Sequence, residues 1–306
     1  LLAVFQPLSP TNEFPYFEYL LDPIDPLMFR FAREPFAKSP RLDPVINKLS
    51  YVVQKAQQTY WDMPRDRLRR SFGLKPKKKG SLYTTPRGEP LTILHAYSSL
   101  ISPKAGDWPE TDIITGFWRL DDISGWEPPA DFLDFLGKGT PPIYLGFGSM
   151  PWGAQRNTEI ITRALHAWGG RAVIGKGWGG VRPEALPDTV YAIDRAPHVK
   201  LFNHVKAVVH HGGAGTTYAG LYAGRPTFAV PQFFDQPYWG RLIYELGCGP
   251  PPVRLRKLTP QILAAALDDL DNTPAYAKAA EALGEKLRLE DGTNRAVDVI
   301  EETLSA

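Results

Sequence analysis

The stretch that decides the fold is "VVHHGGAGTTYAGLYAGRPTFAVPQFFDQPYWG", which runs from Val208 to Gly240. An apolar run ends in two histidines, a glycine cluster follows, and two threonines open a helix-like stretch. A short apolar run bounded by glycines predicts a buried strand, and the residues beyond the turn have helical spacing. A strand, turn and helix in this order could serve a metal ion, a phosphate or only a tight turn.

The two histidines do not suit a metal. Side chains of neighbouring strand residues point to opposite faces, so His210 and His211 cannot easily share one ion. No cysteine or carboxylate follows at the spacing that metal sites use. We therefore predict no metal site at this turn.

The glycine turn suits a phosphate. Glycines let the backbone approach a ligand closely, and the free N–H groups of a first helical turn attract an anion. Thr216 and Thr217 add hydroxyl donors there. The alternative is a plain strand-to-helix turn with a histidine packed beneath it, and the turn alone does not decide between the two.

A second loop of the same kind favours the phosphate. The segment Tyr144–Met150, "YLGFGSM", also ends a predicted strand with glycines and a hydroxyl, Ser149. The dinucleotide fingerprint is absent, because Gly146 and Gly148 lack the third glycine and no well-placed ribose acid follows. The lysine motif of nucleotide hydrolases is absent too. Two such loops without a cofactor fingerprint predict a diphosphate held between them.

The third element is the segment Pro231–Gly240, "PQFFDQPYWG". Asp235 and Gln236 follow a predicted strand and begin a predicted helix, which places them at the carboxyl edge of the sheet. A carboxylate beside an amide can hold sugar hydroxyls through paired hydrogen bonds. The alternative for Asp235 is a helix N-cap.

From Pro141 onward, short β-rich runs alternate with helix-like stretches. Continuous apolar strands separated by helices predict a parallel sheet covered on both faces. We therefore interpret residues 126–290 as one doubly wound α/β domain. The clearest predicted helices are Asn157–Trp168, Gly213–Ala223, Gln236–Leu246 and Thr259–Leu270.

The first 125 residues have a different pattern. Three predicted strands, in "LLAVF", "LTILHAYSSL" and "DIITGFW", do not complete a domain of this type. We expect residues 1–125 to be the C-terminal part of an N-terminal domain, and residues 291–306 to be a C-terminal helix. Trp126–Phe132 carries two prolines and is the predicted linker. Arg65–Lys79 holds eight basic residues and one acid; we weigh contact with anionic lipid against a solvated loop and favour the loop.

The composition argues against several classes of protein. The chain has 306 residues, 43% hydrophobic and 22% charged, as in an ordinary globular protein of two domains. Its net charge of +2 gives no case for nucleic acid. No run of about 18 apolar residues predicts a membrane-spanning helix. The single Cys248 forms no internal disulfide. We expect a cytoplasmic protein, with peripheral membrane contact left open.

Several motifs occur in a fixed order along the chain: "GFGSM", "GKGW", "APH", "HHGGAGTT", "AGRP", "FDQPYWG", "ELGCGP" and "LEDGTNRAVDVIE". This order resembles inverting nucleotide-sugar glycosyltransferases of the GT-B type, an α/β fold of two Rossmann-like domains, the N-terminal one incomplete here. "PKAGDWPETDIITGFWRLDD" narrows the resemblance to sterol glucosyltransferases and their bacterial relatives that glycosylate glycopeptide antibiotics. The resemblance covers residues 90–306 well and residues 1–90 loosely.

The resemblance implies a nucleotide-sugar donor, UDP-glucose first, bound without a metal or other cofactor. His211 and the glycine turn would hold the phosphates, and Asp235 with Gln236 the hexose hydroxyls. The implied donor-binding residues are Ser149, Trp178, Ala196, His198, His211, Gly213, Ala214, Gly215, Thr216, Asp235 and Gln236.

Two positions depart from the plant-type signature. Arg195 stands where that signature stacks a tryptophan on uracil, and Ala219 where it has a ribose-binding glutamate. The choice between UDP and dTDP therefore stays open. The "DLD" of Asp269–Asp271 has the form of the metal motif of the other major glycosyltransferase fold. It lies at the end of a predicted helix far from the glycine loops, and we interpret it as a solvated helix end.

We expect a hexosyltransferase that moves glucose from UDP-glucose to a hydroxyl of a sterol-like or other apolar acceptor. The aromatic stretch Phe14–Phe36 is a candidate acceptor cleft, with core packing as its alternative. Two further alternatives are a transferase for a polar natural product such as a glycopeptide, and a donor-binding fragment without turnover. The "GSxGD" segment that carries the base in the family does not occur here. We therefore name no catalytic residue and expect the base in a missing N-terminal segment.

Overall fold

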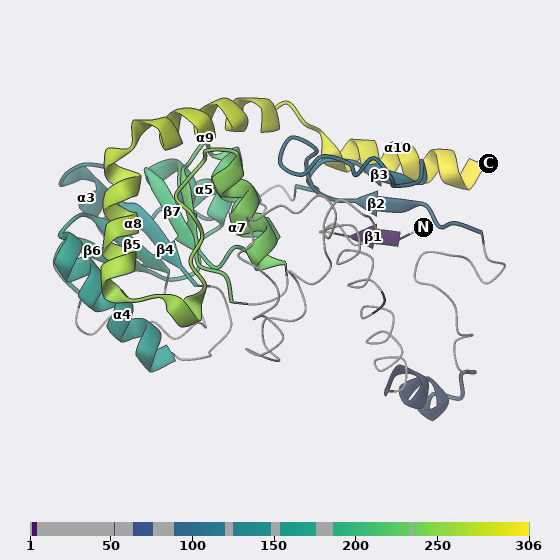
Figure 1. Cartoon of the computed structure of the whole chain (residues 1–306), viewed down its shortest axis with the longest axis horizontal. Helices are drawn as coiled ribbons and strands as arrows, with labels where there is room; N and C mark the ends of the chain where they lie inside the picture. Colours follow the sequence, from purple (N-terminus) through teal and green to yellow (C-terminus); the bar gives the residue numbers. More distant parts are fainter. Residues whose placement is uncertain are drawn as a thin grey trace, which may run out of the picture. The chain divides into compact units, whose positions relative to one another are not determined.

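The computed structural model describes residues 2–4, 52, 64–75, 89–119, 125–147, 154–175, 186–232 and 235–305. The chain divides into two compact units (Figure 1). The first comprises Leu1–Trp118 and Asp291–Ala306, and the second comprises Arg119–Glu290.

The second unit contains a five-stranded parallel sheet. Its strands are β4 (Ile143–Gly146), β5 (Ala172–Gly175), β6 (Val190–Ile193), β7 (Ala207–His210) and β8 (Thr227–Ala229). Their order across the sheet is β6-β5-β4-β7-β8. The chain builds outward from β4 to β6 and then returns to the other side of β4, so the strand order reverses between β4 and β7.

Helices cover both faces of this sheet, because successive side chains of each strand point to opposite sides. Ile143 and Leu145 of β4 pack with α4 (Ala154–Trp168) and α8 (Pro260–Asn272). Tyr144 packs on the opposite face. The elements on that face are α3 (Ala130–Gly137), α5 (His198–Leu201), the 3-10 turn Phe202–His204 and α6 (Ala214–Tyr222).

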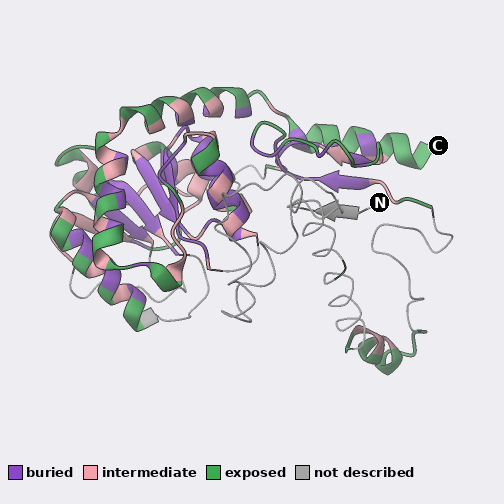
Figure 2. Cartoon of the chain, viewed as in Figure 1, coloured by how far each residue is buried: buried purple, intermediate pink, exposed green. Residues whose placement is uncertain are grey.

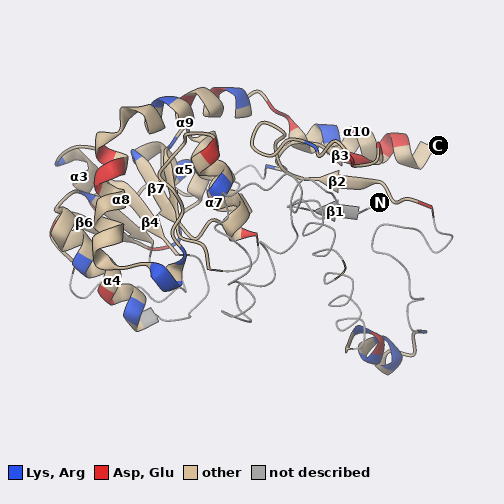
Figure 3. Cartoon of the chain, in the orientation of Figure 1, with Lys and Arg blue, Asp and Glu red and all other residues tan. Residues whose placement is uncertain are grey.

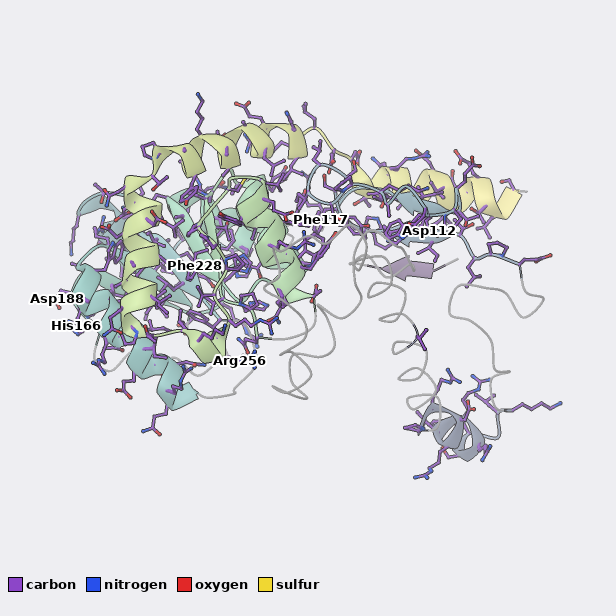
Figure 4. All side chains as sticks on the ribbon, in the orientation of Figure 1. Asp112, Phe117, His166, Asp188, Phe228 and Arg256 are labelled. Carbon is purple, nitrogen blue, oxygen red and sulfur yellow. The ribbon has the colours of Figure 1, made fainter. Side chains whose placement is uncertain are left out.

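Two more helices complete the second unit. α7 (Gln236–Glu245) packs beside β8, and α9 (Pro274–Leu287) packs beside α6. A further 3-10 turn spans Leu255–Lys257. Figure 2 shows the strands as a buried centre with exposed outer helix surfaces, and Phe228 of β8 lies in that interior (Figure 4). The predicted doubly wound parallel sheet is confirmed.

The four predicted helices are present, and their observed bounds shift by at most three residues. The largest shift is at the start of α4, expected at Asn157 and observed at Ala154. The start of α8 follows from two residue types that favour a helix start, a threonine and a proline. The hydroxyl of Thr259 accepts a hydrogen bond from the Ile262 N–H at 3.2 Å, and Pro260 is the first helical residue.

The segment Trp126–Phe132, expected to be the linker, lies inside the second unit. Residues 130–132 already belong to α3, and Phe132 is fully buried. Its ring lies 5.1 Å from that of Tyr191, centroid to centroid. The two prolines directly precede α3, and Pro is well tolerated just before the first helical turn. The helix then packs through Phe132.

The first unit contains a three-stranded parallel sheet in the order β1-β2-β3. The strands are β1 (Leu2–Val4), β2 (Ile93–His95) and β3 (Asp112–Ile114), as expected from the sequence. Leu94 packs against the C-terminal helix α10 (Gly292–Ser305) through Ala296 and Val299. That helix, expected as a separate segment, therefore shares a core with this unit.

A buried polar pair lies in the first unit. Nε2 of His95 lies 3.3 Å from Oδ2 of Asp112 (labelled in Figure 4), and both side chains are almost inaccessible to solvent. Trp108 stacks on the imidazole at 4.4 Å between centroids. Pairing is what makes such burial of polar groups tolerable.

The part of the chain that the structure describes holds no helix with both the length and the apolar character needed to cross a bilayer.

Candidate functional site

Three loops leave the second unit's sheet at one edge. Gly146 of β4 pairs in register with His210 of β7, and His210 pairs with Ala229 of β8. Because the strands are parallel, the residues that follow each of them emerge side by side. This edge lies where the strand order reverses, which is the place where open α/β sheets bind ligands.

The glycine turn after β7 is held by a hydrogen bond to the side chain of His210. Gly212 has φ +84°, a left-handed conformation that favours glycine, and its N–H donates to Nδ1 of His210 at 2.8 Å. A Cβ on Gly212 would lie 2.8 Å from the backbone oxygen of Gln236. The close approach ties the turn after β7 to the start of α7.

The turn delivers an uncapped helix N-terminus. Gly213 is the N-cap of α6 and has no side chain to cap it, and the first intrahelical bond is that from the Thr217 N–H to the Gly213 oxygen at 2.9 Å. The N–H groups of Ala214, Gly215 and Thr216 thus have no carbonyl in a preceding helical turn. In the part of the chain that the structure describes, nothing lies within 4 Å of a Cβ placed on Gly215. A negatively charged group fits this open space.

One expectation about this turn is wrong. We assigned hydroxyl donors to both threonines, but Thr217 is 1% exposed and faces the interior of the unit. The fourth helical residue points inward in a helix that packs on the sheet. Thr216, half-buried, remains the candidate hydroxyl.

His210 and His211 occupy different environments, as the strand periodicity predicts. His210 is fully buried, and burial lowers its pKa well below the usual value. His211 is half-buried, and burial together with the nearby His198 lowers its pKa to about 4. The His211 imidazole is therefore neutral at pH 7, and its buried Nδ1 has no hydrogen-bond partner among the described residues. Neutral imidazole can donate one N–H, and an incoming anion would favour its protonation.

His198 completes the imidazole cluster. Its ring stacks on Phe202 at 4.8 Å, and its Nε2 lies 3.4 Å from the hydroxyl of Tyr144. Burial lowers the pKa of His198 and raises that of Tyr144 to about 12, so both are neutral. Ala196 lies just before it and packs against the same hydrophobic cluster. The wall of the site that these residues form is uncharged and partly aromatic.

The loop after β8 presents a carboxylate. Oδ2 of Asp235 accepts a hydrogen bond from the indole N–H of Trp239 at 2.8 Å. Asp235 stands at the N-cap position of α7, but its side chain makes no capping bond. Burial raises its pKa, and the bond from Trp239 opposes that rise. The carboxylate is held by an indole and makes no capping bond, so the N-cap alternative for Asp235 is not supported.

Gln236 has a structural task. Its Oε1 accepts the backbone N–H of Gln232 at 2.7 Å, and Nε2 of Gln232 donates to the Phe147 carbonyl at 3.2 Å. Gln236 is itself 7% exposed. These bonds join the loops that follow β4 and β8, so one amide oxygen predicted to hold sugar is already engaged within the protein.

The comparisons with known proteins point to one family. A domain described as erythromycin biosynthesis protein CIII-like, C-terminal domain, matches residues 180–298. A sterol 3-beta-glucosyltransferase of Arabidopsis thaliana is 37% identical over 300 residues, which cover 95% of this chain and 43% of the relative. The O-mycaminosyltylonolide 6-deoxyallosyltransferase of Streptomyces fradiae is 34% identical over 267 residues, which cover 85% and 61%.

The solved structure of the glycotransferase of kitacinnamycin has a TM-score of 0.60 to this chain, at 25% identity, covering 86% of this chain and 66% of that one. These matches show that the chain is similar to the sterol glucosyltransferase-like glycosyltransferases of GT-B type. It spans less than half the length of the sterol relative.

The donor-binding residues predicted from the sequence fall into two groups in the structure. The structure brings together the α6 N-terminus, His211 and His198 around the turn after β7, and Asp235 with Gln236 at the start of α7. Ser149 and Trp178 lie outside the described residues. Their roles and those of the rest of the set stay predictions.

The "DLD" motif, Asp269–Asp271, lies in the last turn of α8. Asp271 forms an ion pair with Lys206, and Oδ1 of Asp269 accepts from the Thr273 hydroxyl at 3.1 Å. In the described ranges, no group of three or more His, Cys, Asp or Glu side chains is placed to hold a metal ion.

Sequence reasoning missed three supporting residues, Trp239, Gln232 and Tyr144. Two of them had a signal in their spacing. Trp239 stands four residues after Asp235 and Gln232 stands four residues before Gln236, which is the separation at which side chains meet on a helix or across its first turn. Tyr144 had no such signal, because its contact with His198 joins residues 54 positions apart.

Proposed function

We propose that the chain binds UDP-glucose and takes part in its transfer, with inversion, to a hydroxyl of a sterol-like apolar acceptor. One observation carries the proposal. The uncapped N-terminus of α6 and the carboxylate of Asp235 emerge from adjacent strands at the edge where the strand order reverses. A nucleotide sugar presents a diphosphate beside a hexose, and these two groups match the two junctions.

In this reaction the acceptor oxygen forms a bond to the anomeric carbon as the bond from that carbon to the diphosphate breaks. Negative charge then grows on the departing diphosphate, and catalysis requires groups aimed at it. The N–H groups of α6 and the N–H of His211 are suited to this task. The neutral His211 can also gain a proton as the charge develops, because a nearby anion raises an imidazole pKa. The acceptor proton needs a separate base, and we assign none.

The sugar would be oriented by Asp235. A carboxylate accepts hydrogen bonds from neighbouring hydroxyls, and each such bond to a charged group contributes about 1.5–3 kcal/mol before desolvation. The indole N–H of Trp239 fixes the carboxylate in one orientation. A fixed acceptor discriminates among hexoses that differ in the direction of a hydroxyl.

The acceptor class rests on the names of relatives. The sterol 3-beta-glucosyltransferases favour a sterol and a glucosyl donor. The second candidate is a transferase for a polar natural product, and the relative named for O-mycaminosyltylonolide favours it. The two candidates share the donor side and differ only in the acceptor.

A binding and transfer assay tests the proposal. The full chain is titrated with UDP-glucose, dTDP-glucose and GDP-mannose in EDTA, and is then incubated with UDP-glucose and a sterol carried by cyclodextrin. We expect UDP-glucose to bind without added metal and to bind most tightly of the three. Glycosylation of a macrolide instead of the sterol would favour the second candidate. Donor binding without turnover would identify a donor-binding unit, and failure to bind any nucleotide sugar would overturn the proposal.

A further inference from the structure

Exposed apolar side chains gather in one short segment of the first unit. Leu68, Phe72 and Leu74 are 60%, 72% and 51% exposed, and they lie within seven residues of each other. Scattered exposed hydrophobic residues are normal on a protein surface, whereas a cluster marks a contact site. We call residues 64–75 the basic apolar turn.

The same segment is strongly cationic. It carries Arg65, Arg67, Arg69, Arg70 and Lys75 against a single acid, so its net charge is 5 − 1 = +4, while the whole chain carries only +2. The acid, Asp66, is paired with its neighbour Arg65 at 3.2 Å. Figure 3 shows the helix of residues 64–71 as mostly blue with one red turn.

The two kinds of side chain are arranged on one helix. Leu68 and Phe72 are four residues apart and so lie on one face, and Arg65 and Arg69 run beside them at the same spacing. Arginine stems can lie along apolar surface while their heads reach for phosphate. This is the pattern of helices that lie in the surface of an anionic membrane.

The end of the helix is rigid. Gly73 has φ +70°, and its N–H donates to the oxygen of Arg70 at 3.0 Å, while the Leu74 N–H donates to the oxygen of Arg69 at 2.9 Å. This pair of bonds is the Schellman motif that closes helices. Nε of Arg69 also donates to the carbonyl of Lys75 at 2.8 Å. These bonds set the backbone position of Leu74 directly after the helix.

We propose that the basic apolar turn is a membrane-contact surface that binds an anionic lipid bilayer, with Leu68, Phe72 and Leu74 entering the headgroup region. The arginines then pair with lipid phosphates and carboxylates. Nucleic acid would match the charge but not three exposed apolar side chains, and a second copy of the segment would be repelled by it. The proposal deepens the proposed function, because a sterol-like acceptor is dissolved in a bilayer.

Vesicle binding tests the proposal without donor or acceptor, so its outcome is independent of transfer. The full chain is floated with vesicles of phosphatidylcholine alone and of phosphatidylcholine mixed with phosphatidylserine. We expect binding to the anionic vesicles and loss of binding at high salt. Arg67→Glu with Arg70→Glu should weaken it by about tenfold or more. Phe72→Ser with Leu68→Ser should weaken it as well, while Leu304→Ser, at an 81% exposed leucine of α10, should not.

A fluorescent label tests insertion directly. Cys248 is buried, so a cysteine introduced as Phe72→Cys can be labelled selectively with a polarity-sensitive dye, and Leu304→Cys serves as its control. We expect a blue shift on anionic vesicles for the label at residue 72 alone. The proposal is overturned by equal binding to neutral and anionic vesicles, or by unaltered binding of the Arg67/Arg70 or the Leu68/Phe72 variant. It is also overturned by no shift at residue 72, or by retention on poly-uridylic acid without vesicle binding.

Discussion

The junctions β7–α6 and β8–α7 leave the same edge of the same sheet, yet they offer opposite chemistry. The first presents backbone N–H groups and a neutral imidazole, and its turn contains no carboxylate. The second presents the carboxylate of Asp235, fixed by an indole. Negative charge is favoured at the first junction, and hydroxyl donors are favoured at the second. In the function proposed above, one fold position serves phosphate or sugar according to a few residues after the strand.

The largest effect is expected from disturbing the contact between Gly212 and Gln236, which joins the two junctions. Gly212→Ala forces a side chain into a left-handed backbone and toward the Gln236 oxygen, so we expect a loss of about 2–4 kcal/mol in unfolding free energy. Urea denaturation measures it. Gly215→Ala is the matched control, because its Cβ meets no atom and alanine favours a helix. Equal stability of both variants would show that the two junctions are not tightly joined.

Substitutions of the two histidines test whether the β7–α6 junction binds the diphosphate. His211→Ala removes the N–H donor that we propose for the diphosphate, and we expect UDP affinity to fall about ten- to hundredfold. His210→Ala removes the acceptor of the Gly212 N–H, and we expect about 1–3 kcal/mol of lost stability with little change in UDP binding. Titration calorimetry and melting curves on both proteins give the answer. The distinction fails when both variants lose UDP affinity alike.

A substitution of Trp239 tests whether the β8–α7 junction binds the sugar. Trp239→Phe keeps an aromatic ring in the fully buried position but deletes the N–H that orients Asp235. We expect affinity for UDP-glucose to fall by about five- to tenfold, corresponding to a lost hydrogen bond to a charged group partly offset by relaxation. UDP affinity should stay unchanged. A fall in both affinities together would make Trp239 a packing residue only.

The smallest expected effect is a pH dependence of UDP binding. The pKa of His211 is about 4 in the free protein, and a bound diphosphate raises it, so the protonated form binds UDP more tightly. Affinity should therefore rise as pH falls from 7 to 5, by up to about tenfold. His211→Gln, measured in parallel, isolates the titration of UDP itself. Parallel pH curves for the two proteins would exclude a proton taken up at His211.

The sequence predicted most of the second unit because its signals are local. Continuous apolar strands, glycine turns and helical spacing gave the parallel sheet, the four helices and the opposed environments of His210 and His211. Each of these depends on residues within one element or one turn.

What the sequence did not predict depends on contacts between elements. Thr217 has the same chemistry as Thr216 but faces the core, and only the packing of α6 distinguishes them. The side-chain oxygen of Gln236 accepts a hydrogen bond from Gln232, and the carboxylate of Asp235 accepts one from Trp239. From the sequence alone, both side chains were expected to bind a ligand. Phe132 turns an expected linker into a buried helix because distant residues form its pocket.

The most direct test of the central claim is to measure the affinity of Asp235→Ala for UDP and for UDP-glucose by titration calorimetry. The comparison of the two junctions predicts that UDP-glucose affinity falls about ten- to hundredfold, while UDP affinity stays within about twofold of the unsubstituted protein. Equal loss for both ligands, or no loss for either, would contradict the assignment of the sugar to the β8–α7 junction.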